Sequence, residues 1–475
     1  MPVPGPGYSI TVRLEAPPSA GAAGDLTTAV GRVGGVITAF DVVESQPDRI
    51  VVDISCNARS EEHSRKVTDA LEGLDGVRVR KVSDRTFLLH LGGKLEVTSK
   101  VAIRNREDLS RAYTPGVARV SQAIAANPED ARRLTIKRNT VAVVTDGSAV
   151  LGLGNLGPAA ALPVMEGKAA LFKRFAGVDA WPVCLDTQDT EEIIRAVQLI
   201  APVYGGINLE DIAAPRCFEI EARLRELLDV PVFHDDQHGT AVVVLAALRN
   251  ALRVVGKEIA ACRVAVCGVG AAGSAIIRLL QPLGPADVVA VDVGGIVHTG
   301  RADLDENLKR IAASTNAEGR TGSLSDAVRD ADVFIGVSAP NVLAGADVAT
   351  MAADPVVFAL ANPDPEIDPL EAQRHAAIVA TGRSDYPNQI NNVLAFPGVF
   401  RGLLDAGARE ISDGMLVAAA AAIADVVPVD NLNASFIVPS VFDSAVVPAV
   451  AEAVRRAARE GLTPAAATRV TEQSG

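Results

Sequence analysis

Apolar and polar positions alternate with two different periods along the chain. In the first 90 residues, period-two runs typical of strands occupy 9–14, 36–43, 49–54 and 77–91, and helical spacing covers 26–33 and 60–74. Ser60 is a suitable N-cap for the second helix, whose Val67, Leu71 and Leu74 share one face. The order β-α-β-β-α-β predicts a small ferredoxin-like α+β domain.

This N-terminal region carries no cluster of residues suited to catalysis, because His63 and His90 are isolated from other candidate groups. Its element order and its loop of small residues at 19–24 resemble ACT-type regulatory domains, which often bind amino acids. A small-molecule effector site is one interpretation. A structural or dimerising appendage is the other.

From residue 93 onward, short apolar runs alternate with helical segments, which is typical of a parallel sheet covered by helices. We expect an α/β protein with three domains: an ACT-like domain over 1–92, a parallel-sheet catalytic domain over 93–239, and a Rossmann-type dinucleotide-binding domain with C-terminal helices over 240–475. The predicted strands are 141–145, 203–207, 232–233, 262–267, 288–291, 333–335 and 356–360, and the predicted helices are 163–175, 189–201, 216–228, 240–255, 274–280 and a tail from 410.

The composition narrows the class of protein. A net charge of -13 and the lack of a basic stripe argue against a nucleic-acid partner. The chain starts with neither a basic stretch nor an apolar run, and its apolar segments are too short to span a bilayer, so we expect no membrane association. The five cysteines include no CxxC pair and several lie in apolar runs, which indicates a reduced, cytoplasmic protein.

The sequence GVGAAG at 268–273 follows an apolar strand and opens a helix, as a dinucleotide-binding turn requires. Gly268, Gly270 and Gly273 would let the backbone approach a pyrophosphate at the helix N-terminus, beside Ala271. Asp292, 19 residues beyond the last glycine, would accept hydrogen bonds from a ribose diol. This carboxylate favours NAD over NADP, although the nearby Arg301 could still receive a phosphate.

Two acidic pairs, Glu210-Asp211 and Asp235-Asp236, each come just after a predicted strand. The carboxyl ends of parallel strands meet at one sheet edge, so the pairs could converge there. Carboxylate oxygens suit Mg²⁺ or Mn²⁺, whereas the scattered cysteines and histidines do not have zinc spacing. Solvated turns are the alternative for either pair alone.

Lys168 lies in a largely apolar helical run, where desolvation and a neighbouring cation would lower its pKa and make it a general base. A surface lysine with a buried stem is the alternative. Tyr113 precedes a Thr-Pro-Gly turn that would fix its phenol at the end of an element, and packing in a core is its alternative role.

Together these motifs closely resemble the malic enzyme family, in its shorter bacterial form with an added N-terminal domain. The matching motifs follow one another in order from about residue 95 to the last helices. They are AYTPGV (112–117), TDGSAVLGLG (145–154), MEGKA (165–169), INLEDI (207–212), FHDDQHGT (233–240), ANP (361–363) and SDYPNQINN (384–392).

The resemblance implies oxidation and decarboxylation of malate to pyruvate and CO₂, with reduction of NAD or NADP and a divalent metal. It also implies a homodimer or larger assembly. By position in these motifs, Tyr113 matches the general acid, Lys168 the general base, Glu210, Asp211 and Asp236 the metal ligands, Asp235 a residue just behind them, and Asn362 and Asn392 the asparagines that touch substrate and nicotinamide.

One position departs from the family pattern. Some members carry an arginine inside the TDG…LGLG segment that holds a substrate carboxylate, and here Ser148-Ala149 occupies that place. Carboxylate binding would then fall to Ser148, main-chain amides or asparagines.

Three other functions use parts of the same motif set. A malolactic-type decarboxylase would retain NAD and release lactate. A nucleotide-binding sensor would have no need of Tyr113, Lys168 and three matched carboxylates. An amino-acid dehydrogenase would use a lysine and a Rossmann unit without the metal site.

Overall fold

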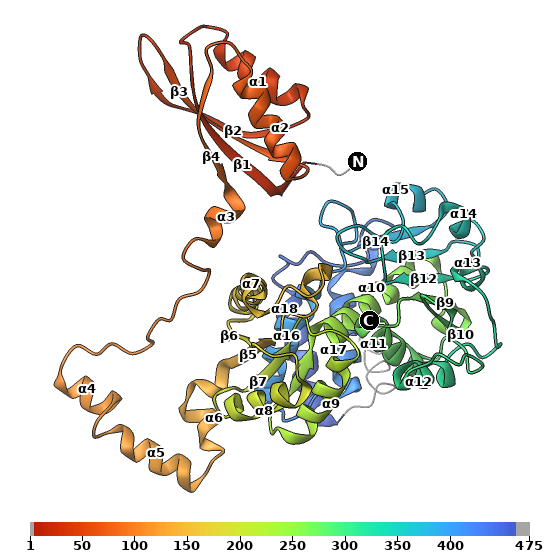
Figure 1. The fold of residues 1–475 in the computed structure, drawn as a ribbon. Coiled ribbons are helices and arrows are strands. Elements are labelled where there is room, and N and C mark those ends of the chain that lie inside the picture. The colour runs from red at the N-terminus through yellow and green to blue at the C-terminus, as the bar shows by residue number, and fades with distance from the viewer. Residues whose placement is uncertain (1–3, 462–475) are drawn as a thin grey trace. The chain divides into compact units, whose positions relative to one another are not determined.

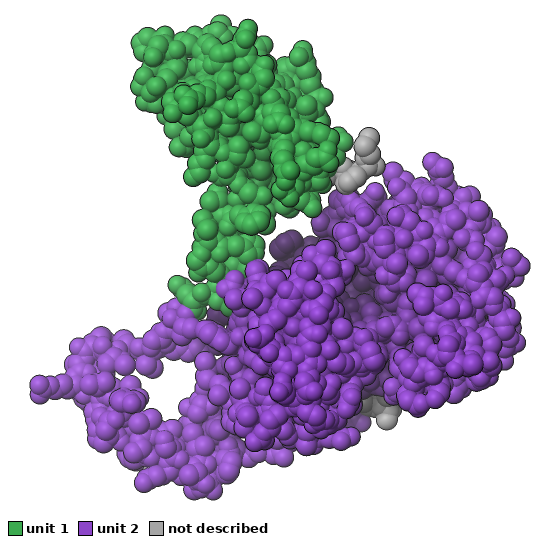
Figure 2. Space-filling model, in the orientation of Figure 1, with its two compact units in different colours: residues 1–96 green, residues 97–475 purple. Residues whose placement is uncertain are grey.

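The computed structural model describes residues 4–461, which form two compact units divided after Glu96 (Figure 2). Unit 1 has a hydrophobic core of its own, and unit 2, which begins at Val97, is built around separate and larger clusters. Each unit can therefore be described by itself.

Unit 1 is a four-stranded antiparallel sheet in the order β2-β3-β1-β4 with two helices on one face (Figure 1). Ile10, Val12 and Leu14 alternate inward along β1 and pack with Leu26 and Leu71 of the helices. This alternation is typical of a sheet covered on one side, and the predicted ferredoxin-like order is confirmed. The elements are β1 (Gly5–Ala16), α1 (Ala22–Arg32), β2 (Val36–Ser45), β3 (Ile50–Ala58), α2 (Glu61–Glu72) and β4 (Arg78–Asp84).

The extended run predicted over 77–91 is wrong in its second half. β4 ends at Asp84, and a short helix, α3 (Arg85–His90), follows. The Asp84 carboxylate accepts hydrogen bonds from the backbone N–H groups of Thr86 and Phe87, which starts the helix. Ser60 caps α2 as predicted, accepting from the N–H of His63.

The first sheet of unit 2 is parallel, in the order β6-β5-β7-β8, with the fully buried β5 inside it. The edge strand β6 is not indicated by the sequence pattern, because it is only half-buried and contains Pro182. The elements are α4 (Arg106–Ala112), α5 (Val117–Ala126), α6 (Asp130–Leu134), β5 (Thr140–Thr145), α7 (Pro158–Ala176), β6 (Asp179–Cys184), α8 (Thr190–Ile200), β7 (Gly206–Leu209), α9 (Arg216–Leu227), β8 (Val232–His234) and a π-helical turn, η4 (Asp235–Gly239).

The second sheet of unit 2 has the order β11-β10-β9-β12-β13-β14 and is parallel except for the two-residue β11. The strand order reverses direction between β9 and β12, the arrangement that confirms the predicted Rossmann-type domain. The elements are β9 (Arg263–Cys267), α11 (Ala271–Leu280), β10 (Asp287–Asp292), β11 (Gly295–Ile296), α12 (Glu306–Ser314), α13 (Leu324–Val328), β12 (Val333–Gly336), α14 (Gly345–Val348), β13 (Val356–Ala359), α15 (Pro369–Ala372) and β14 (Ile378–Thr381).

A long apolar helix, α10 (Thr240–Val255), connects the two sheets. Together with η4 it is long and apolar enough to cross a membrane, but 72% of that apolar window is buried inside the protein, as in a core helix. The helical tail predicted from 410 is wrong in its continuity: α17 (Asp413–Val426) stops before Pro428, which cannot continue it, and α18 (Val446–Glu460) starts later. A further helix, α16 (Phe396–Ala406), precedes them.

Candidate functional site

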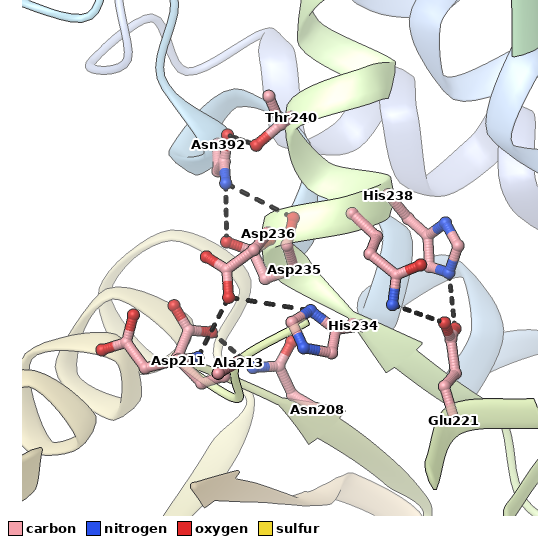
Figure 3. A network of polar contacts seen from close by, with 12 residues as sticks. Asn208, Asp211, Ala213, Glu221, His234, Asp235, Asp236, His238, Thr240 and Asn392 are labelled. Atoms are coloured by element: carbon pink, nitrogen blue, oxygen red, sulfur yellow. Dashed lines mark hydrogen bonds and ion pairs between the residues drawn. The ribbon is translucent and has the colours of Figure 1, made fainter. Parts of the chain in front are cut away.

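The polar residues that follow β7 and β8 lie at the carboxyl edge of the first sheet (Figure 3). Glu210 and Asp211 come directly after β7, while Asp235 and Asp236 begin η4, directly after β8. The backbone N–H of Asp211 donates to Asp236 Oδ2 over 3.0 Å, which ties the two loops together. The two acidic pairs that the sequence separates by more than twenty residues thus form one cluster.

Carboxylate oxygens of Glu210, Asp211 and Asp236 lie within 4.8 Å of one another. Oxygens on one Mg²⁺, each at about 2.1 Å, would lie up to about 4.2 Å apart, so small side-chain movements would bring these oxygens onto one ion. Asp211 Oδ2 is buried without a hydrogen-bond partner among the described residues, and Asp211 has a φ of 54°. The donor set, its spacing and the unpaired oxygen fit a hard divalent cation.

Burial, together with the neighbouring carboxylates, raises the pKa values of Glu210 and Asp211. Burial raises the pKa of Glu210 well above its usual range, even though Lys168 opposes this. Burial and then the charge of Asp236 raise the pKa of Asp211 to about 7. A bound cation would relieve both effects, because it replaces lost solvation and offsets the mutual repulsion.

Lys168, on α7, points into the same cluster and is only 9% exposed. Its ammonium lies 2.6 Å from Asp235 Oδ2 and 3.0 Å from Glu210 Oε1, with the ring centroid of Phe396 4.1 Å away. Burial by itself lowers the pKa of Lys168, but Asp235 and Glu210 together raise it above its ordinary value. The depressed pKa expected from the sequence is therefore not found with both carboxylates charged, because the sequence pattern does not reveal these partners.

Asp235 joins Lys168 to Asn392. The Asn392 amide donates to Asp235 Oδ2 over 2.9 Å, and Thr240 Oγ1 donates to Asn392 Oδ1 over 3.2 Å (Figure 3). Asn392 lies 157 positions from Asp235 in sequence. The structure thus gathers Lys168, the acidic cluster and Asn392 at one place.

Ser148 is near this cluster, but its hydroxyl is already engaged. It donates to Asp146 Oδ1 over 2.5 Å and accepts from the N–H of Ala213 over 2.9 Å. Asp146 is fully buried and its other oxygen pairs with Arg216 over 2.8 Å. In this arrangement Ser148 organises its own loop. The hydrogen bonds that start at Ser148 lead through Asp146 to one arginine, Arg216.

The structure does not bring Tyr113 to Lys168. The Tyr113 side chain is 68% exposed and makes no hydrogen bond to any described residue. It follows α4 in a segment whose three helices, α4, α5 and α6, bury no side chain. We call residues 97–134 the N-terminal arm of unit 2.

The glycine turn has the geometry that a dinucleotide needs. Gly268 has a φ of 96°, and a Cβ on Gly273 would lie 1.8 Å from the carbonyl oxygen of Gly268, so neither position accepts a larger residue. Beside Gly270 there is open space, and Ala271 begins α11, whose first N–H groups have no side-chain cap. These residues fit a pyrophosphate at the helix N-terminus.

Asp292 ends β10, as predicted, but it is paired. Arg301 Nη1 lies 2.6 Å from Asp292 Oδ1, and its other amino group lies 2.6 Å from Asp303 Oδ2. Asn362 is exposed in the loop after β13, and its side chain faces Gly382 in the loop after β14. Both loops follow carboxyl ends of strands in the Rossmann-type sheet, where ligands bind.

Sequence reasoning missed several buried polar residues around the acidic cluster. Asn208 donates to Glu210 Oε2 over 2.8 Å, and neither ring nitrogen of His234 has a hydrogen-bond partner in the described part of the chain. Glu221, on α9, is paired with Gln237 and His238 of η4. Only the position of Asn208 inside an otherwise apolar strand could have signalled such a role.

Comparison with known proteins agrees with this geometry. The family model described as malic enzyme, N-terminal domain, matches residues 92–194 and 187–225, and the model described as malic enzyme, NAD binding domain, matches residues 237–459. These matches cover most of unit 2. They include the Tyr113, Lys168 and Glu210-Asp211 positions and the dinucleotide turn, whereas Asp235 and Asp236 fall in the short stretch between the two matches.

Individual relatives cover most of the chain. A protein of Geobacillus stearothermophilus described as NAD-dependent malic enzyme is 56% identical over 96% of this chain and 95% of its own length. A bifunctional malic/malolactic enzyme of Bacillus subtilis is 54% identical over 80% of this chain and 94% of its own. The crystal structure of NAD-dependent malic enzyme from Thermotoga maritima has a TM-score of 0.76 and 49% identity, covering 78% of this chain and 99% of that one. The chain belongs to the malic enzyme family.

Proposed function

We propose that the chain oxidises and decarboxylates malate to pyruvate and CO₂ with NAD as hydride acceptor and Mg²⁺ or Mn²⁺ as metal. The observation that carries the proposal is the convergence of Glu210, Asp211 and Asp236 beside the buried Lys168. A dehydrogenase without metal chemistry would have no use for three clustered carboxylates. The relatives named as malic enzymes support the same reaction.

Glu210, Asp211 and Asp236 would hold the metal, which supplies Lewis-acid stabilisation of negative charge on substrate oxygens when bound. Lys168 would take the hydroxyl proton of malate as carbon 2 gives up its hydride, once a cation held by Glu210 offsets one of the two carboxylates that raise the pKa of the lysine. Asp235 would orient Lys168, and Tyr113 would protonate carbon 3 after CO₂ leaves. Asn392 and Asn362 would position substrate and nicotinamide. Ser148 would contribute to binding of the substrate carboxylate by holding its loop in place.

Arg216 is our candidate for the cation that the Ser148-Ala149 position lacks. Its guanidinium is about one-third exposed, and one amino group pairs with the buried Asp146. Asp146 bonds to Ser148, and Ser148 bonds to the residue two positions after Asp211. These bonds connect Arg216 to the loop directly after the proposed ligand Asp211, so Arg216 would support a substrate carboxylate bound by that loop.

NAD is the proposed cofactor, and NADP stays a second candidate. Asp292 favours the ribose diol of NAD. Arg301 neutralises Asp292 and could bind a 2′-phosphate, so discrimination between the two cofactors would be moderate. Relatives of both kinds exist, since a Rhizobium meliloti protein described as NADP-dependent malic enzyme is 46% identical over 78% of this chain.

For the assembly we propose a homodimer or larger oligomer in which the N-terminal arm of one subunit delivers Tyr113 to the site of another. Support comes from burial: the arm exposes Val97, Val101, Ile103, Leu109 and Tyr113. Such a stretch of apolar side chains needs a covering surface. Beside the acidic cluster, Leu151, Leu153 and Leu156 are also exposed, and the Leu151 N–H faces Asp211 Oδ1 at 3.4 Å. Exchange of an identical arm between subunits would cover both surfaces.

The N-terminal unit is proposed as a regulatory domain over 1–92, followed by the catalytic domain over 93–239 and the dinucleotide domain over 240–475. We also propose that this domain binds a small-molecule effector and that the protein is cytoplasmic. The Bacillus subtilis relative matches four-fifths of this chain over nearly its whole length, which favours a regulatory rather than a catalytic role for the remainder.

A malolactic reaction is the second candidate, because a relative of that description is 54% identical. One experiment separates the candidates: malate-dependent reduction of NAD and of NADP, measured side by side with Mn²⁺ and with EDTA, and with pyruvate and lactate assayed in the products. Free NADH with pyruvate supports the proposal. Lactate without free NADH contradicts it, and activity that survives EDTA contradicts the metal site.

A further inference from the structure

One buried carboxylate near the site has no role in the proposed reaction. Glu221 lies on α9 and is 5% exposed, yet it neither contacts Lys168 nor belongs to the acidic cluster. Its Oε2 accepts from Gln237 Nε2 over 3.0 Å, and its Oε1 lies 2.5 Å from His238 Nε2 (Figure 3). A charge taken out of water persists only when such partners satisfy it.

Both partners of Glu221 belong to η4, the same five-residue turn that begins with Asp235 and Asp236. A π-helical turn is rare, and it occurs mostly as a single turn, frequently at a functional site. Glu221 bonds to the second half of this turn, while Asp235 and Asp236 in the first half face Lys168 and the backbone of Asp211. The position of the first half therefore depends on how Glu221 holds the second half.

The tautomer of His238 is fixed by a contact at its second ring nitrogen, Nδ1. Arg278, on α11, approaches His238 Nδ1 at 3.1 Å. A guanidinium only donates, so Nδ1 accepts and the ring proton sits on Nε2, where it faces Glu221. The ring cannot turn over without breaking both contacts. Glu221, His238 and Arg278 thus form a chain from α9 through η4 to the helix that begins at the dinucleotide turn.

We infer that Glu221 is a positioning residue for the metal centre: it holds η4 through Gln237 and His238 so that Asp236 meets Glu210 and Asp211 with ligand spacing. The inference rests on the proposed function of the acidic cluster. Residues that orient metal ligands from behind typically contribute 10–100-fold, in order of magnitude, to metal affinity.

The test is Mn²⁺ binding to the full-length protein, measured by the electron paramagnetic resonance signal of free Mn²⁺, without substrate. Glu221→Gln exchanges one acceptor oxygen for an amide donor that faces the Gln237 amide. We expect Mn²⁺ affinity to fall about 10–100-fold, with a raised KM for Mn²⁺ and kcat at saturating Mn²⁺ changed much less. Glu219→Gln, an exposed neighbour on α9, is the matched control and should bind like the wild type.

The thermal midpoint in EDTA distinguishes positioning from general destabilisation. Glu221, Gln237 and Arg278 line a cavity of about 830 Å³ between α9, α11 and α12, so water can reach the donors that the variant leaves unpaired. We therefore expect a folded variant. If Glu221→Gln does not fold, Arg278→Gln, whose side chain is 41% exposed, should lower Mn²⁺ affinity in the same direction.

Folded variants at both positions that bind Mn²⁺ within twofold of the wild type would overturn the inference. Asp236→Asn tests the underlying site separately. Weakened binding in Asp236→Asn supports the metal centre whatever Glu221→Gln does. Equal binding in Asp236→Asn and wild type overturns the metal centre itself, and with it the role of Glu221.

Discussion

Lys168 Nζ lies 2.6 Å from Asp235 Oδ2, and neither group is exposed to solvent by more than a tenth. The carboxylate is held in turn by Asn392. In a buried site such a pair fixes where the ammonium points, since turning away would leave a charge without a partner. The proposed base is therefore oriented before substrate arrives.

Asp235→Asn should lower kcat while leaving the metal in place. Asparagine keeps the shape but removes the charge that orients Lys168, so we expect a loss of about 10–100-fold in kcat. Mn²⁺ affinity should stay within a few-fold, because the Asp235 side chain bonds to Lys168 and Asn392 and holds none of the three proposed ligands in place. Asp236→Asn is the comparison and should lose Mn²⁺ affinity. If instead Asp235→Asn lost Mn²⁺ affinity and Asp236→Asn lost only kcat, the roles assigned to the two aspartates would have to be exchanged.

Stability of the metal-free protein should depend on pH through Asp211. Its folded pKa is raised from 3.8 to about 7, so between these values the folded state binds more protons than the unfolded state. Unfolding free energy must therefore fall as pH rises through this window. In EDTA, the thermal midpoint of the wild type should be higher at pH 5 than at pH 8. The same measurement on Asp211→Asn gives the pH dependence of all other groups, and the difference between the two proteins is the contribution of Asp211.

Asp211→Asn removes this destabilising charge. At pH 8 in EDTA we expect its thermal midpoint to exceed that of the wild type by about 2 °C or more. Adding Mn²⁺ should stabilise the wild type and leave the variant nearly unchanged. A variant that is equally stabilised by Mn²⁺ would contradict the assignment of Asp211 as a ligand.

Asp292→Ser should shift cofactor preference toward NADP. The substitution removes the carboxylate that would bind the ribose diol and frees Arg301 Nη1 from its 2.6 Å pairing. A charge-assisted hydrogen bond to a 2′-phosphate should then raise the NADP-to-NAD ratio of kcat/KM by about tenfold or more. Adding Arg301→Ala to Asp292→Ser should abolish the gain. An unchanged ratio in the single variant would remove Arg301 from cofactor recognition.

The proposed delivery of Tyr113 between subunits can be tested by mixing two inactive proteins. Tyr113→Phe and Lys168→Ala subunits, coexpressed with different affinity tags, would form one complete site per mixed dimer if Tyr113 acts on its neighbour. With random pairing, about one quarter of wild-type activity should return. No activity should return if Tyr113 serves its own subunit.

A matched control uses Tyr113→Phe with the double variant Tyr113→Phe, Lys168→Ala. No mixed dimer of that pair has an intact tyrosine, so activity should stay absent in either arrangement. As a separate check on its role, Tyr113→Phe should impair pyruvate formation more than reduction of supplied oxaloacetate. Equal losses in both assays would remove Tyr113 from the protonation step.

Much of the fold follows from local patterns in the sequence. Val141–Val144 and the runs leading to GVGAAG are apolar because both faces of a parallel sheet are covered, and this signal needs no tertiary information. The edge strand β6 was not predicted, because one side of it meets solvent. Helix α3 was not predicted, because Asp84 caps it within a run of alternating apolar and polar residues.

What the sequence by itself determined is the chemistry available: the glycine turn, the acidic pairs at strand ends, and a lysine in an apolar helix. Local spacing encodes these, because each depends on a strand and the loop directly after it. Only the tertiary structure decided the partners. Lys168 meets Asp235 across 67 positions, and Arg301 neutralises Asp292. The exposure of Tyr113 and the hydrogen bonds from Glu221 to η4 could likewise not be predicted from the sequence. Charge, burial and orientation are set by residues that meet only when distant elements pack.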